Sequence, residues 1–428
     1  MKRAVIVGSG AGGATVAKEL QGRYQVTVLE AGQQFRPFGV NLTFVERTKQ
    51  TGLLFDERAI QLLFPAMQVR RTPDRMVLVN GVGVGGTTTI CAGNAMRLDQ
   101  DLRAAGIDLD DEFKELQREV PITTEHRSNW SEVTRRLFDI CEEMALAPEP
   151  TPKMGDYERC ANCGRCVLGC PYGVKWDSRR FLDLALDHGA SLVTGCKVTR
   201  IVTQDREARG VEAQLRGRQI FYPADLVVVA AGGLGTPIIL QDSGIKCVPG
   251  LSVDPVLTVA ARWTGSRQNT EMTMPFIVRK PGYMLSPYFD FLSFFFNRRW
   301  RHRAQHTLGL MIKLADANQG SISAAAVQKT LTTADRATLT EAVGLCTDVL
   351  GRLGIDPAAV ELGTVNAGHP GGMLPLSQTE AAGLHHSHLP NNLYVADASL
   401  LPRSLGGPPI LTIMAIAKRV SRICSEFA

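Results

Sequence analysis

The stretch of sequence that decides the fold is AVIVGSGAGG at residues 4–13, which leads through a short apolar segment into QVTVLE at residues 25–30. The apolar run predicts a buried strand, the glycines a tight turn, and the following segments a helix and a second strand. In such a βαβ unit a G-x-G-x-x-G turn brings backbone N–H groups close to a pyrophosphate, and an acid after the second strand binds a ribose. The residues at these positions are Gly8, Gly10, Gly13 and Glu30. We therefore expect a dinucleotide site here, with a glycine-rich turn of no function as the alternative.

Further apolar strands are predicted far along the chain from this opening unit. Residues 225–231, DLVVVAA, form the continuous apolar run that is typical of a parallel strand covered on both faces. Residues 197–202 and 209–213 predict two shorter strands. The nucleotide-binding domain is therefore expected to be assembled from separated segments. Residues 247–365 mix short strand-like runs with one helical segment, and we expect them to form a second domain.

The composition is that of an ordinary globular protein. Of the 428 residues, 44% are hydrophobic and 21% are charged, which excludes a disordered or coiled-coil chain. The net charge of +5 is too weak to indicate nucleic acid as a partner. No apolar run is long enough to span a membrane. Because Met1, Lys2 and Arg3 lead directly into the first predicted strand, we expect a cytoplasmic protein.

Four of the ten cysteines fall within eleven residues and are followed by a proline, in the pattern C-x2-C-x2-C-x3-C-P. They are Cys160, Cys163, Cys166 and Cys170. This run is typical of bacterial ferredoxins and predicts one iron–sulfur cluster, either 4Fe–4S or, on three ligands, 3Fe–4S. The fourth ligand is Cys170 or a remote thiol, for which Cys91 and Cys196 are candidates. A zinc site and a purely structural run are the alternatives.

At this point the sequence resembles the glucose–methanol–choline (GMC) flavoprotein oxidoreductases. The resemblance rests on residues 8–30, on the GGT sequence at 85–87, on residues 230–237 and on the closing block at 392–412. It implies FAD as the cofactor, with Gly8, Gly10, Gly13 and Glu30 at its ADP half and Val198 at the adenine. It places Gly86, Thr87, Asn94, Asp397 and Ala398 near the pyrophosphate, the ribityl chain or the flavin ring. The Gly-Cys-Pro sequence at 169–171, with Lys175 downstream, is similar to a subset that includes long-chain alcohol oxidising members.

The resemblance also implies which residues carry the chemistry. Members place a histidine in a His-x-x-Gly pattern over the flavin, and His369 fits it. This residue would take the hydroxyl proton while hydride leaves for the flavin. The second site residue of the family, a His or Asn, falls on Pro408, which has no side-chain donor or acceptor. Another residue must therefore supply the second contact, and Asn366 is one candidate.

Together these features predict an α/β fold with a Rossmann-like FAD-binding domain, a smaller α+β substrate domain and an iron–sulfur insertion. The expected boundaries are 1–100, 176–246 and 366–428 for the FAD-binding and active-site segments, 101–175 for a helical segment with the cluster, and 247–365 for the substrate domain. We expect a dehydrogenase that oxidises a small-molecule CH–OH substrate and passes electrons singly to an electron-carrier protein or a partner redox subunit. A reductase of a carbonyl or activated double bond, and a non-catalytic electron-transfer subunit, are the alternatives.

An aromatic stretch within residues 283–303 runs into a basic cluster. Eight aromatic side chains lie between Tyr283 and Trp300, and four arginines lie between residues 298 and 303. Three interpretations are open: a core element with a solvated basic end, a surface for a partner or for peripheral membrane contact, and a lid over an apolar substrate.

Overall fold

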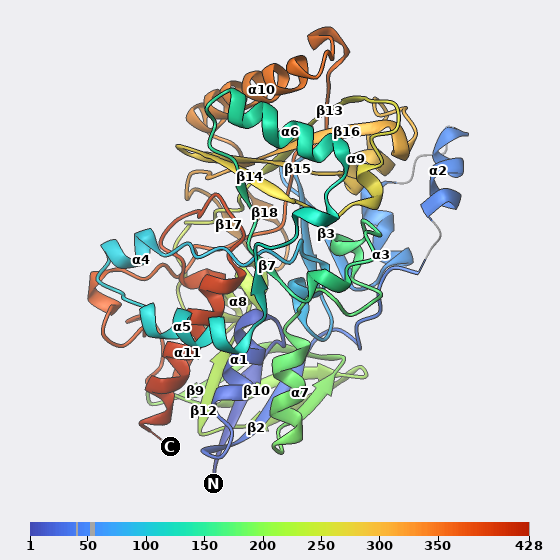
Figure 1. Ribbon diagram of the computed structural model, residues 1–428. Coiled ribbons are helices and arrows are strands. Elements are labelled where there is room, and N and C mark those ends of the chain that lie inside the picture. The colour runs from blue at the N-terminus through green and yellow to red at the C-terminus, as the bar shows by residue number, and fades with distance from the viewer. Residues whose placement is uncertain (40–41, 52–55, 428) are drawn as a thin grey trace.

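A computed structural model describes residues 1–39, 42–51 and 56–427 of the chain (Figure 1). The opening βαβ unit forms as the sequence predicts, and its two strands lie in a five-stranded sheet in which all neighbouring strands are parallel. The spatial order of this sheet is β21 (Leu393–Val395), β12 (Leu226–Val229), β1 (Lys2–Val7), β2 (Tyr24–Glu30) and β8 (Ser191–Thr194). Every residue of β12 is buried, as expected for a central parallel strand. Strands distant in the sequence therefore assemble one nucleotide-binding domain.

A three-stranded antiparallel sheet packs against the parallel sheet in a common hydrophobic core. Its strands are β11 (Arg218–Pro223), β10 (Glu207–Leu215) and β9 (Cys196–Gln204). The helices of this half of the molecule are α1 (Ala11–Glu19), α4 (Gln100–Ala104), α5 (Asp110–Glu119), α7 (Arg179–Asp187), α8 (Gly232–Asp242) and α11 (Ile410–Ser425). Both chain termini lie at this end of the molecule (Figure 1).

The other half is built on a nine-stranded sheet with a core of its own. Its strands are β3 (Met67–Arg71), β4 (Val77–Gly81), β20 (Asn366–Ala367), β13 (Val256–Arg262), β16 (Thr307–Leu314), β15 (Tyr283–Pro287), β14 (Phe276–Lys280) and β6 (Glu149–Pro150), with β19 (Glu361–Leu362) paired to β13. The helices α10 (Thr333–Arg352) and α6 (Glu132–Glu143) cover this sheet at the end away from the termini (Figure 1). α10 begins with a capping box between Thr332 and Asp335, which explains its sharp start.

The predicted boundary at residue 100 does not follow the sheets. Strands β3 and β4 fall within the segment 1–100 that was assigned to the nucleotide-binding domain, yet β4 pairs with β20 in the nine-stranded sheet. The chain therefore crosses into the second half early and returns. The remaining short elements are β5 (Ile122–Thr123), β7 (Lys153–Met154), β17 (Ser321–Ile322), β18 (Val327–Gln328), α2 (Leu42–Gln50), α3 (Ile60–Leu63) and α9 (Phe291–Phe296).

The aromatic stretch is part of the interior. The side chains of Phe289, Phe291, Phe294, Phe295 and Trp300 are each less than 9% exposed, and their rings pack on one another. They therefore do not offer the exposed apolar surface that a membrane contact through 283–303, one of the three open interpretations, would need. Across the described residues, no helix has the length and apolar character needed to cross a membrane.

Candidate active site

The turn between β1 and α1 has the features of an anion cradle. Gly8 has a φ of +96°, and a Cβ on Gly13 would lie 2.0 Å from the carbonyl oxygen of Gly8, so both positions require glycine. Gly10 begins α1 without a side-chain cap, which leaves the first N–H groups of this helix available to a ligand. A pyrophosphate fits such a helix start.

A second glycine-rich loop closes over this turn. Gly86 begins the 3₁₀ helix η2 (Gly86–Ile90) with a φ of +53°, and a Cβ on it would lie 2.9 Å from the Cα of Gly10. The Ser9 hydroxyl joins the two loops, because it donates to Glu30 at 2.6 Å and accepts from the N–H of Gly85 at 3.1 Å. Glu30 is buried at the end of β2, and the N–H groups of Ser9 and Gly32 also donate to its carboxylate. Carboxylate lone pairs remain for a ribose.

The other expected nucleotide contacts surround the same end of the parallel sheet. Asp397 follows β21, is buried, and accepts hydrogen bonds from Thr236 and from the N–H groups of Gly232 and Ser399. Ala398 begins the 3₁₀ helix η10 (Ala398–Leu400) directly after it. Val198 lies in β9, which is an edge strand, so one backbone edge of β9 is free of strand pairing. This fits a backbone contact with an adenine.

A large cavity opens beside these loops, at the junction of the two halves. Its polar and motif-bearing lining residues include Thr87, Cys91, Asn94, Asn366, His369 and Pro408. Its remaining walls are mostly apolar. They include Phe38, Ile60, Met67, Val79, Ile90, Val167, Leu168, Met274, Phe291, Leu292, Phe295, Phe296 and Met311. The structure thus brings the predicted catalytic residues together with Thr87 and Asn94, and it makes part of the aromatic stretch a cavity wall.

His369 is held in a buried charged group at this cavity. Its Nδ1 lies 3.4 Å from Oδ2 of Asp254, without hydrogen-bond alignment, and is buried. The side chain of His369 is 22% exposed and lines the cavity, while Nδ1 is buried, which leaves Nε2 as the nitrogen able to accept a proton from a bound molecule. Burial, together with the positive charge of Lys313, lowers the pKa of His369 to about 4. The imidazole is therefore neutral at physiological pH and able to accept a proton.

Lys313 and Asp254 complete the group, and sequence reasoning missed both. The ammonium of Lys313 lies 3.5 Å from Oδ2 of Asp254, and both side chains are almost fully buried. Burial alone would raise the pKa of Asp254, but the charge of Lys313 and the contact with His369 hold it below its usual value. The available sequence signal was a lysine inside the apolar run LGLMIKL at 308–314. A buried lysine needs a partner, which the sequence does not identify.

The predicted second residue, Asn366, has its amide nitrogen engaged elsewhere. This nitrogen donates to the carbonyl oxygen of Thr364 at 3.1 Å and to Asp290 at 3.5 Å. Asp290 in turn caps α9 through the N–H of Ser293. Asn366 therefore lines the cavity beside His369 but is tied to the start of α9.

The four cysteines of the C-x2-C-x2-C-x3-C run line a second, smaller cavity, together with Tyr157, Lys175 and Met272. The 3₁₀ helix η5 (Cys166–Leu168) separates the two cavities, since Val167 and Leu168 line the larger one. In the described residues, no three Cys, His, Asp or Glu side chains converge on a point that could hold a single metal ion. Burial raises the pKa of Cys160 to about 11 and also raises that of Cys163. These thiols are therefore protonated when nothing binds them.

Two buried lysines flank the cysteines without carboxylate partners. Lys153 donates to the carbonyl oxygens of Ala92 and Thr273 and to Oδ1 of Asn94. Lys175 donates to Thr88 and Thr89 carbonyl oxygens, and its Nζ lies 3.6 Å from the Cys91 sulfur. Within the described ranges, no carboxylate lies at ion-pair distance from either ammonium.

The hydroxyl of Tyr157 also lacks a partner, although it is buried against the cysteine cavity. A buried hydroxyl is normally hydrogen-bonded and a buried ammonium is normally balanced by an anion, because the alternative costs free energy. The surroundings of this cavity therefore suit an anionic group.

The parallel sheet and its glycine turn are typical of dinucleotide-binding oxidoreductases. Comparison with known proteins identifies the family. Residues 3–250 match the family model described as GMC oxidoreductase. The chain belongs to the GMC oxidoreductase family. The resemblance found in the sequence is thus confirmed, and so is the α/β fold with a Rossmann-like FAD-binding domain. Members of this family act on CH–OH groups with a flavin.

The chain is similar to several proteins of known sequence. An uncharacterized protein of Methanocaldococcus jannaschii is 26% identical over 432 residues, covering 97% of this chain and 98% of that protein. An uncharacterized GMC-type oxidoreductase of Mycobacterium tuberculosis is 30% identical over 61% of this chain and 42% of its own length. A long-chain-alcohol oxidase of Arabidopsis thaliana is 26% identical over 57% of this chain and 34% of its own length. The latter two are thus much longer than the part that matches.

The fold is also that of a solved structure. Pyridoxine 4-oxidase from Mesorbium loti superimposes with a TM-score of 0.72, over 99% of both chains, at 16% sequence identity. At this identity the likeness concerns the fold.

Proposed function

We propose that this protein is an FAD-dependent dehydrogenase that oxidises an alcohol-type substrate and releases the electrons singly through an iron–sulfur cluster. The acceptor is an electron-carrier protein or a partner redox subunit. The observation that carries the proposal is the position of η5: Val167 and Leu168 line the large cavity, while Cys166 and Cys170 on either side line the cysteine cavity.

FAD, when bound, supplies the hydride acceptor. The residues that hold its ADP half are Gly8, Gly10, Gly13 and Glu30, with Val198 at the adenine and Asp397 and Ala398 at the carboxyl end of β21. Gly86, Thr87 and Asn94 lie where the second loop meets the large cavity. His369 accepts the hydroxyl proton at Nε2, and Asn366 lines the cavity beside it. The observed fit is the pair of glycine loops, which pack so closely that a Cβ at residue 8, 13 or 86 would collide with neighbouring backbone.

The cluster, when bound, supplies one-electron transfer. Its ligands are Cys160, Cys163, Cys166 and Cys170, because all four line one cavity, whereas Cys91 lines the other and Cys196 lies in β9. Cluster ligands bind different iron atoms, so they need not converge on one point. Backbone hydrogen bonds from residues 162 and 165 reach Cys160 and Cys163. The partnerless hydroxyl of Tyr157 and the two lysines without carboxylate partners, Lys153 and Lys175, fit the negative charge of thiolates.

The substrate is an alcohol with an apolar body, because the large cavity has apolar walls around a single histidine base. A primary aliphatic alcohol such as 1-dodecanol matches this lining. The Arabidopsis relative is a long-chain-alcohol oxidase, which supports the choice of a long-chain alcohol as the probe.

Changing Cys163→Ser tests the two parts of the proposal separately. A hard oxygen replaces a soft sulfur ligand, so iron and acid-labile sulfide should be largely lost while FAD stays bound. Anaerobic flavin reduction by 1-dodecanol should stay within about threefold of the wild type. Turnover with a one-electron acceptor protein should fall about tenfold or more, because the electron exit is removed.

The matched control is Cys247→Ser, since this half-buried thiol lies outside both cavities. The control should keep its iron and its turnover. If Cys163→Ser keeps full iron and full turnover, the cluster is not the electron exit. If 1-dodecanol and its homologues fail to reduce the flavin of the wild type, the substrate class is wrong.

A further inference from the structure

A lysine side chain faces the substrate cavity from the middle of a fully buried strand. All eight residues of β16 are buried, and Lys313 lies at its seventh position with only 2% of its side chain exposed. It lines the same cavity as His369 and Pro408. An ammonium is costly to bury, so its presence in an otherwise apolar strand calls for a chemical reason.

The contacts of Lys313 leave part of its hydrogen-bonding capacity free. Its Nζ donates to the backbone carbonyl of Asp254 at 3.2 Å and lies 3.5 Å from Oδ2 of the same residue. An ammonium has three N–H donors, and these contacts use two directions. Among the residues that the structure describes, no further acceptor is bonded to it. The third direction is therefore available to a molecule in the cavity.

Asp254 fixes the position of Lys313 relative to the base. Its Oδ1 accepts from the Ser404 hydroxyl and from the N–H of Gly406, while Oδ2 lies between Lys313 and His369. One carboxylate therefore holds the ammonium and the imidazole side by side. The backbone of Asp254 has a φ of +51°, a left-handed conformation that is uncommon overall but that Asp tolerates better than most residues.

Three other groups that line the cavity differ from Lys313 in this respect. Pro408 has no side-chain donor, and the amide nitrogen of Asn366 already donates to Thr364 and Asp290. Lys49 also lines the cavity, but among the described residues no ion pair joins its ammonium to Asp254, the carboxylate beside His369. Lys313 is the cation that shares a carboxylate with the base.

We propose that Lys313 is a catalytic residue that donates a hydrogen bond to the substrate oxygen, in the role left open by Pro408. The proposal rests on the alcohol oxidation argued above. As the substrate reacts, the O–H proton passes to Nε2 of His369 and the C–H hydride, with its electron pair, passes to the oxidised flavin. The C–O bond becomes a carbonyl, and Lys313 keeps all its protons.

The same ammonium has two linked effects. It disfavours protonated His369, which makes the base weak, and it stabilises negative charge on the substrate oxygen, which makes the hydroxyl more acidic. A weak base suffices when the proton it removes is acidified by a neighbouring cation. Asp254 then stabilises the imidazolium that forms.

The test compares an anion with a neutral alcohol of the same chain length. Decanoate places a negative charge where the substrate oxygen becomes negative, and binding is followed by the change in flavin absorbance. In Lys313→Met we expect decanoate to bind about 10- to 100-fold more weakly, the value of a charge-assisted hydrogen bond. The affinity for 1-decanol should change less than about threefold. The rate constant for flavin reduction by 1-decanol should fall about 100-fold.

The matched control is Lys329→Met, which removes another buried lysine, paired with Asp316 at 2.6 Å and outside the cavity. It should keep the affinity for decanoate. Equal decanoate affinity in wild type and Lys313→Met would overturn the proposal, even if the wild type oxidises alcohols. Failure of 1-alcohols to reduce the wild-type flavin would overturn the oxidation chemistry, while the decanoate comparison would still decide whether Lys313 binds an anion.

A second variant guards against loss of folding. If Lys313→Met does not bind FAD, the pair Lys313→Met with Asp254→Asn removes both charges together. This pair should also lose decanoate affinity and fast flavin reduction. Wild-type rates in the pair, or failure of both variants to bind FAD, would mean that Lys313 is structural.

Discussion

At the scale of single residues, the proposed chemistry depends on the charge balance around His369. Two charged groups set this balance. Asp254 lies in the loop before β13 and contacts His369, and Lys313 lies in β16 and contacts Asp254. Their charges cancel, so the imidazole sits in a buried and electrically neutral group. This arrangement keeps His369 unprotonated and ready to accept a proton.

The pH dependence of flavin reduction should report this state of His369. A pKa of about 4 leaves the imidazole neutral, so the rate constant should be flat from roughly pH 6 to 8 and decline as the pH falls through about 4. Lys313→Met removes a positive charge that disfavours the imidazolium. The pKa should rise in this variant, and the decline should begin at higher pH. Stopped-flow reduction by 1-dodecanol across this range measures both profiles, and a wild-type decline centred near pH 6.5 would contradict the account.

Sequence patterns predicted the residues that belong to motifs and missed those that act through three-dimensional pairing. His369 and the four cysteines stand in recognisable spacings, and the structure places each of them at a cavity. Lys313 and Asp254 are 59 residues apart and follow no spacing rule. Their pairing arises only when β13 and β16 align, so a single sequence gave no basis for it.

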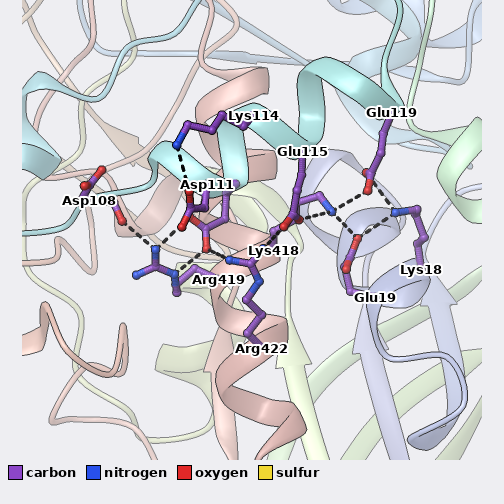
Figure 2. Close-up of polar contacts among 11 residues, drawn as sticks. Lys18, Glu19, Asp108, Asp111, Lys114, Glu115, Glu119, Lys418, Arg419 and Arg422 are labelled. Carbon is purple, nitrogen blue, oxygen red and sulfur yellow. Dashed lines mark hydrogen bonds and ion pairs between the residues drawn. The ribbon is translucent and has the colours of Figure 1, made fainter.

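At the scale of elements, ion pairs fasten the C-terminal helix to its neighbours. Figure 2 shows side chains of α11 meeting those of α5 and α1. The buried ammonium of Lys418 lies 2.7 Å from Glu19, 3.1 Å from Glu115 and 2.9 Å from Glu119. Lys18 also pairs with Glu19 and Glu119. Because α11 begins at the cavity with Ile410, this network anchors an element that carries part of the active-site wall.

Lys418→Met should therefore destabilise the protein. Three carboxylates would lose a shared partner, and we expect the free energy of unfolding at neutral pH to fall by about 2 kcal/mol, since these carboxylates are partly exposed. Burial alone would lower the pKa of Lys418, but the hydrogen bonds to Glu19 and Glu119 raise it. Its contribution is thus complete below the ordinary lysine pKa and lost as the pH rises through the raised value.

Urea unfolding followed by circular dichroism measures this difference, which should narrow at alkaline pH. Lys114→Met is the control, because Lys114 pairs only with Asp111 among the charged residues described, and both side chains are mostly exposed. Its effect should stay within about 0.5 kcal/mol. Equal stability of Lys418→Met and wild type would show that the network does not fasten α11.

Elements with a local signal were predicted well, and elements defined by their environment were not. The glycine turn and its flanking strands formed as expected because each residue there has a local conformational reason. The aromatic stretch has no such signal, since composition alone does not distinguish a core element from a surface. The structure buries α9 and turns Phe291 and Phe295 toward the cavity.

At the scale of the whole molecule, the chain places two sites of different chemistry on the two sides of η5. One is the apolar cavity lined by His369, and the other is the cysteine cavity, which is flanked by two lysines without carboxylate partners. The lining of the apolar cavity comes from segments that lie far apart in the sequence, whereas the cysteine cavity is lined by residues within 157–175 and by Met272. The short separation of the two cavities suits the proposed enzyme, in which the flavin takes up two electrons together and the cluster passes them on one at a time.

The most direct test of this claim is an anaerobic titration of the purified holoprotein with 1-dodecanol, followed by optical absorption and electron paramagnetic resonance of the same samples. We predict that the flavin absorption bleaches and that the signal of a reduced iron–sulfur cluster then appears in the same molecules. Flavin that bleaches and releases peroxide rapidly in air, with no iron present or with a cluster that stays redox-silent, would contradict the account.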